Sequence, residues 1–418
     1  MRAASQAVSY LARLDQVSDS EKWPLLRGWL YSEPLPLFEE LRRDRPVVSL
    51  PELDFCTRHA DCTLILRRHD TFSVALYRPK QGDYFMAQDD TAAHWREKSI
   101  MRSILDFEDI PAMRAFVAEE TRRRLSEADG EIELVRQITR GIPVALVQQF
   151  FGFRNADPDK LIDWSYWNQQ DAFHNQIFDA PGPVDAEEIV RRRKMAGFAM
   201  GFYLGRLVLR RSIAAKAGLE GDDPMSRLIR LSFSGSLKFN LKNVLYNSGG
   251  LLIGAVETTN HAVVNALEFL LADPARRQAA EAAAHDGTAI DGHVFEALRF
   301  RPAFPYFFRT ATRDTLLSAD TPHAVTVKEG RTVLAVTHSA MFDPVAFPNP
   351  LTFDPSRDLG DTFTLGQGIH ECLGRAVAAA MLPEIVRQVL LMPGLKPDTP
   401  PDYAGTKVPQ SWRLRWAA

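Results

Sequence analysis

The chain has 418 residues, of which 45% are hydrophobic and 25% are charged, and its formal net charge is -3. This length is ample for a large core, and the near balance of charge predicts neither nucleic acid nor an anionic membrane as a partner. The three cysteines, Cys56, Cys62 and Cys372, include no CxxC pair, which argues against a disulfide framework and a thiolate zinc site. We therefore expect a protein of a reducing compartment, the cytoplasm.

Helical patterns dominate the chain from its N-terminal part onward. An amphipathic helix at 37–42 ends before Pro46, and the segment 47–56 is typical of a short hairpin. Residues 342–359, rich in Pro, Asp and Phe, indicate an ordered irregular loop. We expect a mainly α fold, a helical body with a small β region. Further helices are predicted at 94–131, 143–151, 191–211, 244–272, from Asp273 onward and at 373–391, and short strands at 324–327 and 332–336.

No internal repeat or linker divides the sequence, so we expect one domain that spans residues 1–418, without a fused reductase or ferredoxin domain. The first 15 residues lack a long apolar run. The most apolar stretch, 244–272, carries Asn247, Glu257 and Asn260 in its middle, which would be costly in lipid. It is predicted to be a long buried helix, and no membrane anchor is expected.

The strongest functional signal is the segment FTLGQGIHECLG, which contains Cys372. Gly366 and Gly368 permit a tight turn and the close approach of a flat ligand to the backbone. Cys372 follows at the start of an apolar helix, whose partial positive charge favours a thiolate. Gly374 leaves room beside the sulfur, and His370 adds a donor nearby. A lone cysteine beside a glycine turn is often only structural, but the spacing G-x-G-x-H-x-C-x-G disfavours a chance match.

This segment resembles the haem-binding loop of the cytochromes P450, with Leu365 standing where the family usually has Phe. The resemblance implies that Cys372 ligates the iron of heme b, and a thiolate ligand pushes electron density onto haem iron and favours O–O cleavage. Similar motifs extend from about His94 to Gly374. The resemblance implies the cytochrome P450 fold, in which the haem lies between a long distal helix and the helix that bears the cysteine.

An ExxR pair, Glu296 and Arg299, precedes the cysteine segment. Spacing of three places both side chains on one helical face, where they can pair. By itself such a pair is most often a solvated surface ion pair. Because it lies upstream of the cysteine segment, it resembles the family's K-helix pair, with Arg357 as the third member. The resemblance implies a structural role for these three residues.

The resemblance also implies which side chains contact the haem. Arg309 corresponds to an Arg that binds a propionate, because an Arg can pair with a carboxylate through two hydrogen bonds. His94 and Lys98, four residues apart, correspond to a His–Arg pair at the entry of the family's C-helix. Lys98 keeps the charge of the usual Arg but not its fork geometry. Alone, either residue would be interpreted as a surface side chain. The implied contacts are His94, Lys98, Arg309, Leu365, Gly366, His370 and Gly374.

An acid–alcohol pair, Glu257 and Thr258, lies within the long apolar stretch. A buried Glu is costly unless it is paired or functional, and a Thr hydroxyl can open a helix and admit water. The segment resembles the family's oxygen-activation motif, with Gly254 and Ala255 as the oxygen-binding groove and with Glu257 and Thr258 in proton delivery. The alternative is a Thr bonded back to its own helix and a Glu paired with a basic neighbour.

The resemblance implies a monooxygenase that inserts one oxygen atom of dioxygen into an apolar small molecule. Electrons would come from NAD(P)H through a separate ferredoxin or flavodoxin with its reductase. A peroxide-driven peroxygenase would fit a site that lacks the acid–alcohol pair, and a haem sensor or carrier would need no proton relay. Glu257 and Thr258 count against both alternatives.

In the family, the stretch after ExxR and the loop before the C-helix wall the substrate pocket. Aromatic walls without an obvious Lys or Arg favour a compact, mostly uncharged apolar or aromatic substrate, for which Tyr306 could offer one polar anchor. Some of these rings could equally be plain core. The expected pocket residues are Tyr84, Phe85, Leu251, Phe304, Pro305 and Tyr306.

Overall fold

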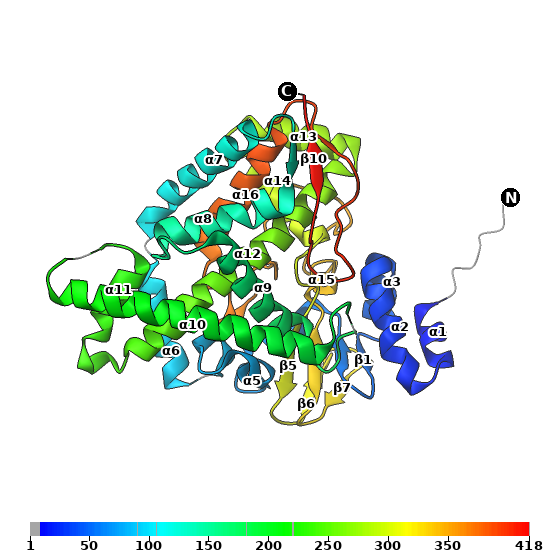
Figure 1. The fold of residues 1–418 in the computed structure, drawn as a ribbon. Helices are drawn as coiled ribbons and strands as arrows, with labels where there is room; N and C mark the ends of the chain where they lie inside the picture. The colour runs from blue at the N-terminus through cyan, green and yellow to red at the C-terminus, as the bar shows by residue number, and fades with distance from the viewer. Residues whose placement is uncertain (1–8, 90, 106, 181, 220, 418) are drawn as a thin grey trace. The chain divides into compact units, whose positions relative to one another are not determined.

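The structure is a computed structural model, which describes residues 9–89, 91–105, 107–180, 182–219 and 221–417 (Figure 1). The chain forms two compact units, each assembled from segments that are far apart in the sequence. The smaller unit contains the chain up to Leu76, Phe304–Phe353 and Gly360–Glu371. The larger unit contains Tyr77–Ala303, Asp354–Leu359 and the chain from Cys372 onward.

The smaller unit is built on a five-stranded sheet of order β1-β2-β8-β5-β3. The first two strands form an antiparallel hairpin in which Val48 pairs with Phe55, as the sequence predicts. β8 joins this hairpin in parallel, so that Phe55 pairs with Leu334. Its strands are β1 Val47–Ser49, β2 Asp54–Cys56, β3 Phe72–Ser73, β5 Phe307–Ala311 and β8 Thr332–Ala335, and β6 Thr315–Leu317 pairs separately with β7 Val325–Val327.

Short helices accompany this sheet within the smaller unit. In α3, Pro34 stands at the first helical position, where its missing N–H costs nothing, and Leu37, Phe38 and Leu41 form the buried face. The amphipathic pattern at 37–42 is therefore confirmed as a helix. These helices are α1 Tyr10–Gln16, α2 Asp19–Ser32, α3 Pro34–Asp44, α4 His59–Arg67, α15 Thr337–Ala340 and a single 3-10 turn at Gly368–His370.

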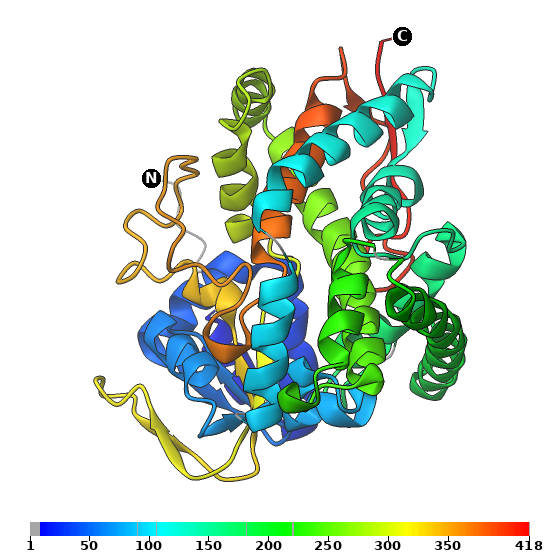
Figure 2. The same ribbon diagram turned by 90° about the vertical axis from the view of Figure 1, so that its left-hand side faces the viewer.

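The larger unit is helical. Its helices are α5 Arg78–Gln81, α6 Ala92–Ile104, α7 Ile110–Ser126, α8 Gly141–Phe150, α9 Pro158–His174, α10 Ala186–Lys216, α11 Pro224–Ser232, α12 Leu241–Leu271, α13 Pro274–Ala284, α14 Ile290–Phe300 and α16 Arg375–Leu390. Short 3-10 turns lie at Ala75–Tyr77, Phe85–Ala87, Phe107–Asp109 and Gly235–Leu237, and a π-helix at Val135–Thr139 precedes α8. In both ribbon views α7 and α16 lie side by side (Figures 1 and 2).

The centre of the larger unit is α12, which contacts α8, α9, α10, α14 and α16. Asn240 starts the helix: its side chain accepts a hydrogen bond from the N–H of Lys242, while the side chain of Asn243 accepts from the N–H of Asn240. Buried apolar residues such as Val256 and Leu267 then line the helix on several sides. This burial confirms the long buried helix that the sequence predicts.

The mainly α class with a small β region is confirmed, and the other long predicted helices occur. The stretch 94–131, predicted as helical throughout, is instead divided into α6 and α7 by a 3-10 turn at Phe107–Asp109, and Glu131 begins a strand. One sheet was not predicted: β4 Glu131–Glu133, β10 Arg413–Arg415 and β9 Lys396–Pro397 form a three-stranded sheet in the order β4-β10-β9. Its register pairs Ile132 with Leu414, and a contact of such sequence separation leaves no local periodic signal. Among the residues that the structure describes, none of the helices is long and apolar enough to cross a membrane.

Candidate active site

The residues expected to form the site fall on both units, and each unit is described separately. In the smaller unit, Gly366 and Gly368 have φ values of +71° and +74°, which L side chains rarely adopt. A Cβ on Gly368 would lie 2.4 Å from the carbonyl oxygen of Leu66 in α4. Glycine at 368 therefore serves the packing of this turn against α4, a role different from the approach of a flat ligand that the sequence suggests.

Cys372 lies in the larger unit, in the turn that leads into α16, and not in the first turn of the helix itself. Its side chain is partly exposed, whereas Cys56 and Cys62 are buried. Burial raises the pKa of both buried thiols, which keeps them protonated. A Cβ on Gly374 would meet a single atom within 4 Å, the sulfur of Cys372 at 3.9 Å. The structure thus leaves space beside this sulfur.

Two of the expected haem contacts share α6. The side chains of His94 and Lys98 are 0% and 4% exposed, so neither is the surface side chain that each alone would suggest. Nδ1 of His94 lies 2.9 Å from the carbonyl oxygen of Phe85, which can only accept, so this nitrogen carries the proton. His94 and Lys98 stand four residues apart on α6, so a ring nitrogen and an ammonium group lie on one face of this helix.

Tyr84 packs directly on α12. A Cβ on Gly250 would lie 2.3 Å from a ring carbon of Tyr84, so only glycine at 250 allows the ring to rest there. Burial raises the pKa of the Tyr84 phenol, and the charges of Cys372 and Glu97 raise it further. Tyr84 therefore remains a neutral hydrogen-bond donor.

The oxygen-activation segment lies in the middle of α12. The hydroxyl of Thr258 donates to the carbonyl oxygen of Gly254 at 2.6 Å, and a Cβ on Gly254 would meet nothing within 4 Å. The carbonyl oxygen of Ile253 accepts hydrogen bonds from two side chains of α9, Ser165 at 3.4 Å and Gln169 at 2.8 Å. Two polar side chains of α9 thus bind a backbone carbonyl of α12 that lies one residue before Gly254 and two before Ala255.

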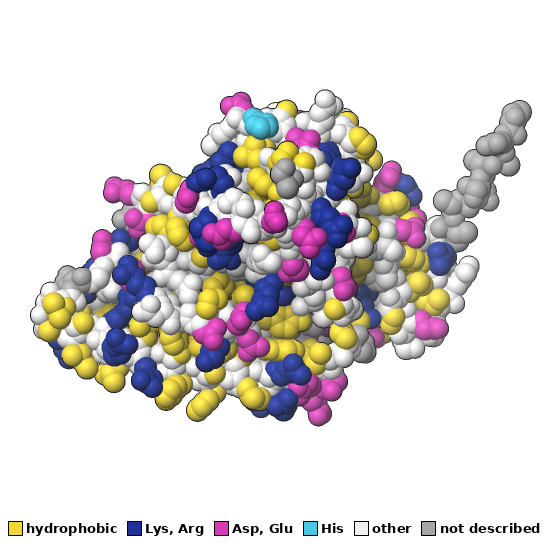
Figure 3. Space-filling model, turned by 45° about the horizontal axis from the view of Figure 1, so that its top comes forward, with side chains coloured by type: hydrophobic (Ala, Val, Ile, Leu, Met, Phe, Trp, Pro, Cys, Tyr) yellow, Lys and Arg dark blue, Asp and Glu magenta, His cyan; other side chains and the backbone are white. Residues whose placement is uncertain are grey.

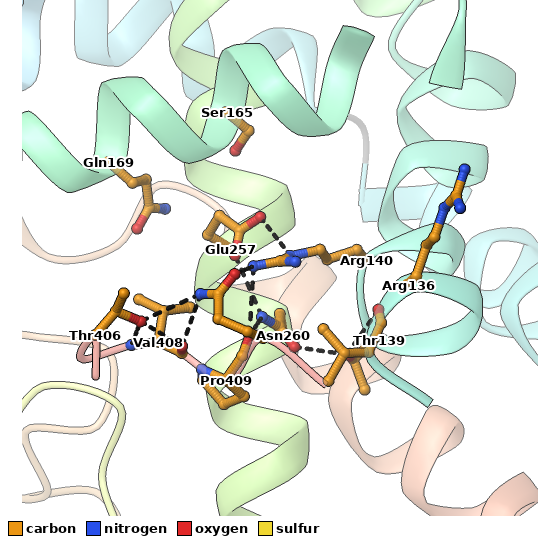
Figure 4. Close-up of polar contacts among 12 residues, drawn as sticks. Arg136, Thr139, Arg140, Ser165, Gln169, Glu257, Asn260, Thr406, Val408 and Pro409 are labelled. Carbon is orange, nitrogen blue, oxygen red and sulfur yellow. Dashed lines mark hydrogen bonds and ion pairs between the residues drawn. The ribbon is translucent and has the colours of Figure 1, made fainter. Parts of the chain in front are cut away.

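Glu257 points into a buried polar cluster with Arg140 and Asn260 (Figure 4). Its Oε1 lies 2.8 Å from Nε of Arg140, and its Oε2 accepts from the side-chain amide of Asn260 at 3.2 Å. The same amide donates to the carbonyl oxygen of Pro409 at 3.0 Å, and Thr139 donates to the side-chain oxygen of Asn260 at 2.6 Å. The cluster joins α12 to the π-helix, to α8 and to the C-terminal segment.

Burial raises the pKa of the Glu257 carboxyl above its ordinary value of 4.5, while Arg140 and Asn260 oppose the rise. Glu257 is thus paired with a basic neighbour, and Thr258 is bonded back to its own helix. These are the contacts expected if the acid–alcohol pair has only a structural role. They are compatible with proton delivery, because a carboxyl with a raised pKa holds a proton closer to neutral pH. The relay role of Glu257 and Thr258 stays a prediction.

The ExxR residues meet Arg357 within the larger unit. Arg299 donates to both carboxylate oxygens of Glu296, at 2.8 Å and 2.9 Å, and Arg357 donates to Oε1 at 3.2 Å. The backbone N–H of Asp354 also donates to Oε1, at 3.1 Å. Glu296 and Arg299 are fully buried. A buried triad of this kind ties α14 to residues 354–359.

The remaining candidates lie in the smaller unit, apart from Phe85 and Leu251, which lie in the larger unit. Arg309, in β5, is buried and donates to the carbonyl oxygen of Phe308. Tyr306 is buried, whereas Phe304 and Pro305 are half-buried, and the Phe304 ring lies 6.2 Å from that of Phe307. Leu365 and His370 are half-buried. Leu251 is buried, as is Phe85 in the larger unit.

Four polar residues of the site were not predicted: Arg140, Asn260, Ser165 and Gln169. Asn260 follows Glu257 by three residues, so helical spacing could have paired the two. Arg140 precedes Glu257 by more than a hundred residues, and no local pattern links them. The guanidinium of Arg140 also lies over the ring of Tyr166 in α9, at 5.4 Å from its centroid.

Comparison with known families identifies one match. The family model described as Cytochrome P450 matches residues 289–400, which include the ExxR pair and Cys372. The erythromycin C-12 hydroxylase of Saccharopolyspora erythraea is 29% identical over 327 residues, covering 77% of this chain and 77% of that protein. The vitamin D(3) 25-hydroxylase of Pseudonocardia autotrophica is 26% identical over 383 residues, covering 86% of each chain.

Solved structures share the fold. An open form of the cytochrome P450 EryK from S. erythraea superposes with a TM-score of 0.76 at 24% identity, covering 93% of this chain and 96% of that one. A ligand-free cytochrome P450 from Mycobacterium smegmatis gives a TM-score of 0.76 at 22% identity, covering 95% of this chain and 100% of that one. These likenesses confirm the fold that the sequence motifs imply.

The raised pKa of Glu257 predicts a pH dependence of stability. The folded protein binds this proton more tightly than the unfolded chain, so the contribution of the group to the free energy of unfolding falls as pH rises from 4.5 toward the folded-state pKa. We expect Arg140→Gln, which removes the countercharge, to raise that pKa further and to steepen the fall. Urea unfolding midpoints measured between about pH 5 and pH 8 check this.

Arg192→Gln, on the exposed face of α10, is the matched control and should leave the slope unchanged. When Glu257→Gln is combined with Arg140→Gln, the additional fall of the unfolding midpoint with pH that Arg140→Gln causes should disappear. An Arg140→Gln protein whose midpoints follow those of the wild type at every pH would contradict the electrostatic account.

Proposed function

We propose that this chain is a cytochrome P450 monooxygenase that transfers one oxygen atom of dioxygen to an apolar small molecule with electrons from a separate redox protein. The observation that carries this proposal is the partly exposed sulfur of Cys372, in the spacing G-x-G-x-H-x-C-x-G, with open space on the side of Gly374. Cys56 and Cys62 are buried and cannot offer a thiolate to a large ligand.

The side chains present suit haem b. We propose that Cys372 ligates the iron, and that the buried Lys98, His94 and Arg309 contact the propionates. Leu365, Gly366, His370 and Gly374 are the further proposed contacts. Haem, when bound, supplies the iron chemistry that activates dioxygen. What the chain adds is binding, orientation and control of protons.

Proton control is proposed for two residues of α12. The Thr258 hydroxyl donates to the Gly254 carbonyl at 2.6 Å, so its oxygen can accept a hydrogen bond from a water molecule. Glu257 keeps a carboxyl of raised pKa one residue away, in contact with Arg140 and Asn260. Gly254 and Ala255 leave a small-residue groove beside the hydroxyl. Protons would pass from Glu257 through water to Thr258.

Electrons are proposed to come from NAD(P)H through a ferredoxin or flavodoxin with its reductase. For the substrate, we propose a compact, mostly uncharged apolar or aromatic molecule. Three of the proposed pocket residues belong to the larger unit, and there the neutral phenol of Tyr84, seated on Gly250, offers a hydrogen-bond donor among apolar neighbours. Phe85 and Leu251 are apolar and buried. Phe304, Pro305 and Tyr306 are the proposed pocket residues of the smaller unit.

The ligand assignment predicts the result of one substitution. Cys372→Ser should abolish the thiolate-type spectrum of the reduced carbonyl complex, because a serine hydroxyl does not replace the thiolate as a strong iron ligand. Cys62→Ser, at a buried cysteine, is the matched control and should keep that spectrum. A normal thiolate spectrum in Cys372→Ser would rule out Cys372 as the ligand.

The proposed relay predicts a loss of coupling. Thr258→Ala should still bind haem and consume NAD(P)H, while product formed per NAD(P)H falls about tenfold or more and hydrogen peroxide rises, because general acid catalysis is lost. Product, peroxide and NAD(P)H are measured together. Thr259→Val, at the buried neighbouring threonine, is the control. Unchanged product yield in Thr258→Ala would assign Thr258 the purely structural role of a hydroxyl bonded to Gly254.

The substrate proposal is tested by spectral titration of the haem with three ligand sets. Compact aromatic compounds are expected to shift the spectrum at lower concentration than long-chain fatty acids, whose carboxylate would want a cation. The third set contains macrolides and secosteroids, because the similar hydroxylases are named for erythromycin and vitamin D(3). A response to fatty acids alone, or tightest binding of the third set, would refute the compact-substrate proposal.

A further inference from the structure

The outward face of α10 carries a stripe of exposed apolar side chains. It consists of Met195, Phe198, Phe202, Leu209 and Ile213, whose exposed fractions lie between 59% and 80%. These positions are spaced by three, four, seven and four residues, so they follow one line along the helix. We call them the α10 stripe.

The opposite face of α10 is already occupied. Ile189, Ala196, Leu204 and Val208 are buried, and the helix contacts α9, α11 and α12. A helix that is apolar on both faces is normally covered on both faces. In the larger unit α10 lies in front of α12 in Figure 1. The stripe is therefore open to a partner.

The size of the stripe matches what a stable protein contact needs. Five large side chains at these exposures amount to roughly 600 Å² of apolar surface, which reaches the upper limit for the largest patch on a typical monomer. A standard interface buries about 800 Å² on each partner, so the stripe and its polar margins would supply most of one. Two aromatic rings near the centre, Phe198 and Phe202, resemble the anchors that dominate such interfaces.

Charges along the helix identify the partner and its direction. The first turns of the helix carry the exposed acids Asp185 and Glu187, and the exposed basic residues Arg191, Arg192 and Lys194 follow them. The C-terminal half has no acidic residue and carries exposed Arg206, Arg210 and Lys216. Two parallel copies would place like charges together. Two antiparallel copies place the acidic end of each helix beside the basic end of the other, which is electrostatically favourable.

We propose that the protein forms a homodimer in which the α10 stripes of two copies pack antiparallel around a two-fold axis at Phe202. This register places Phe202 against its own symmetry mate and Met195 opposite Leu209, since both lie seven residues from Phe202. It also places Glu187 within one residue of the position opposite Lys216. The same patch serves both copies, as a two-fold interface requires.

Several of the other basic residues of this helix already have partners within the same copy. Arg191 and Arg192 both bind Glu188, at 2.6 Å, and the guanidinium of Arg192 lies 4.6 Å from the centroid of the Trp167 ring in α9. The guanidinium of Arg206 lies over the Phe202 ring, 5.7 Å from its centroid, so its apolar stem already follows the stripe. The inference uses surface residues alone and is independent of the proposed function.

Sedimentation of the haem-containing protein over a wide concentration range tests the proposal. The wild type should pass from monomer to dimer, and Phe198→Glu should weaken the dimer by about tenfold or more, because it buries a charge at the interface. Val345→Glu changes an equally exposed apolar residue of the smaller unit and is the matched control, expected to dimerise as the wild type does. Unchanged haem spectra in both variants would show that the fold is intact.

Disulfide formation tests the register. Phe202→Cys should form a disulfide-linked dimer under mild oxidation, because each copy meets its own mate at the axis. Ile213→Cys lies about 16 Å along the helix from Phe202, so its two copies would be far beyond the reach of a disulfide. The native Cys56 and Cys62 are buried, and the wild type controls for Cys372.

Four outcomes would overturn the proposal. A wild type that stays monomeric at every concentration would do so, as would a dimer that Phe198→Glu leaves intact. Cross-linking of Phe202→Cys and Ile213→Cys alike would refute the antiparallel register, because that result requires parallel helices. If the monomer instead binds vesicles of anionic lipid, and Phe198→Glu abolishes this binding, the stripe is a lipid-binding surface and no dimer interface.

Discussion

The buried carboxylate of Glu257 imposes the constraint on which the core of the larger unit depends. A charge at that depth is strongly unfavourable unless it is paired, and the pairing must come from outside α12 because the helix supplies only Asn260. Arg140 provides it from the junction between a π-helix and α8. Asn260 then binds the Pro409 carbonyl, so the C-terminal segment is drawn into the same cluster. The π-helix that precedes Arg140 is a local departure from α-helical geometry, and such departures are frequent at functional sites.

A second constraint is the need for residues without a side chain on one side of α12, at Gly250 and Gly254. Gly250 admits the ring of Tyr84, and one turn later Gly254 leaves open space and accepts the hydroxyl of Thr258, a further turn along. The polar groups of α9 meet the helix between these glycines, at the Ile253 carbonyl. On this side, a long apolar helix thus gains polar contacts without a charged side chain, an arrangement that would suit the proposed proton relay.

The helix α10 illustrates how one element can serve two surfaces. Its inner residues pack against α9 and α12. The residues of the outer α10 stripe are apolar but exposed, so they add little to the packing of the larger unit. Basic and acidic side chains are interspersed over the described surface drawn in Figure 3, so bulk charge does not distinguish this face. What distinguishes it is the heptad-like spacing of large apolar side chains, a pattern typical of helices that pair.

The sequence alone determined the elements and the chemistry that resides in short motifs. Helical periodicity located α3, α10, α12 and α16, and the spacing around Cys372 identified the family, because these signals are local and are set by residues within a few turns of one another. Tertiary structure decided what connects distant positions. It alone revealed that Arg140 pairs with Glu257, that Gly250 seats Tyr84, that Gly368 packs on Leu66 and that β4 pairs with β10, because each contact joins residues whose separation leaves no periodic trace in the sequence.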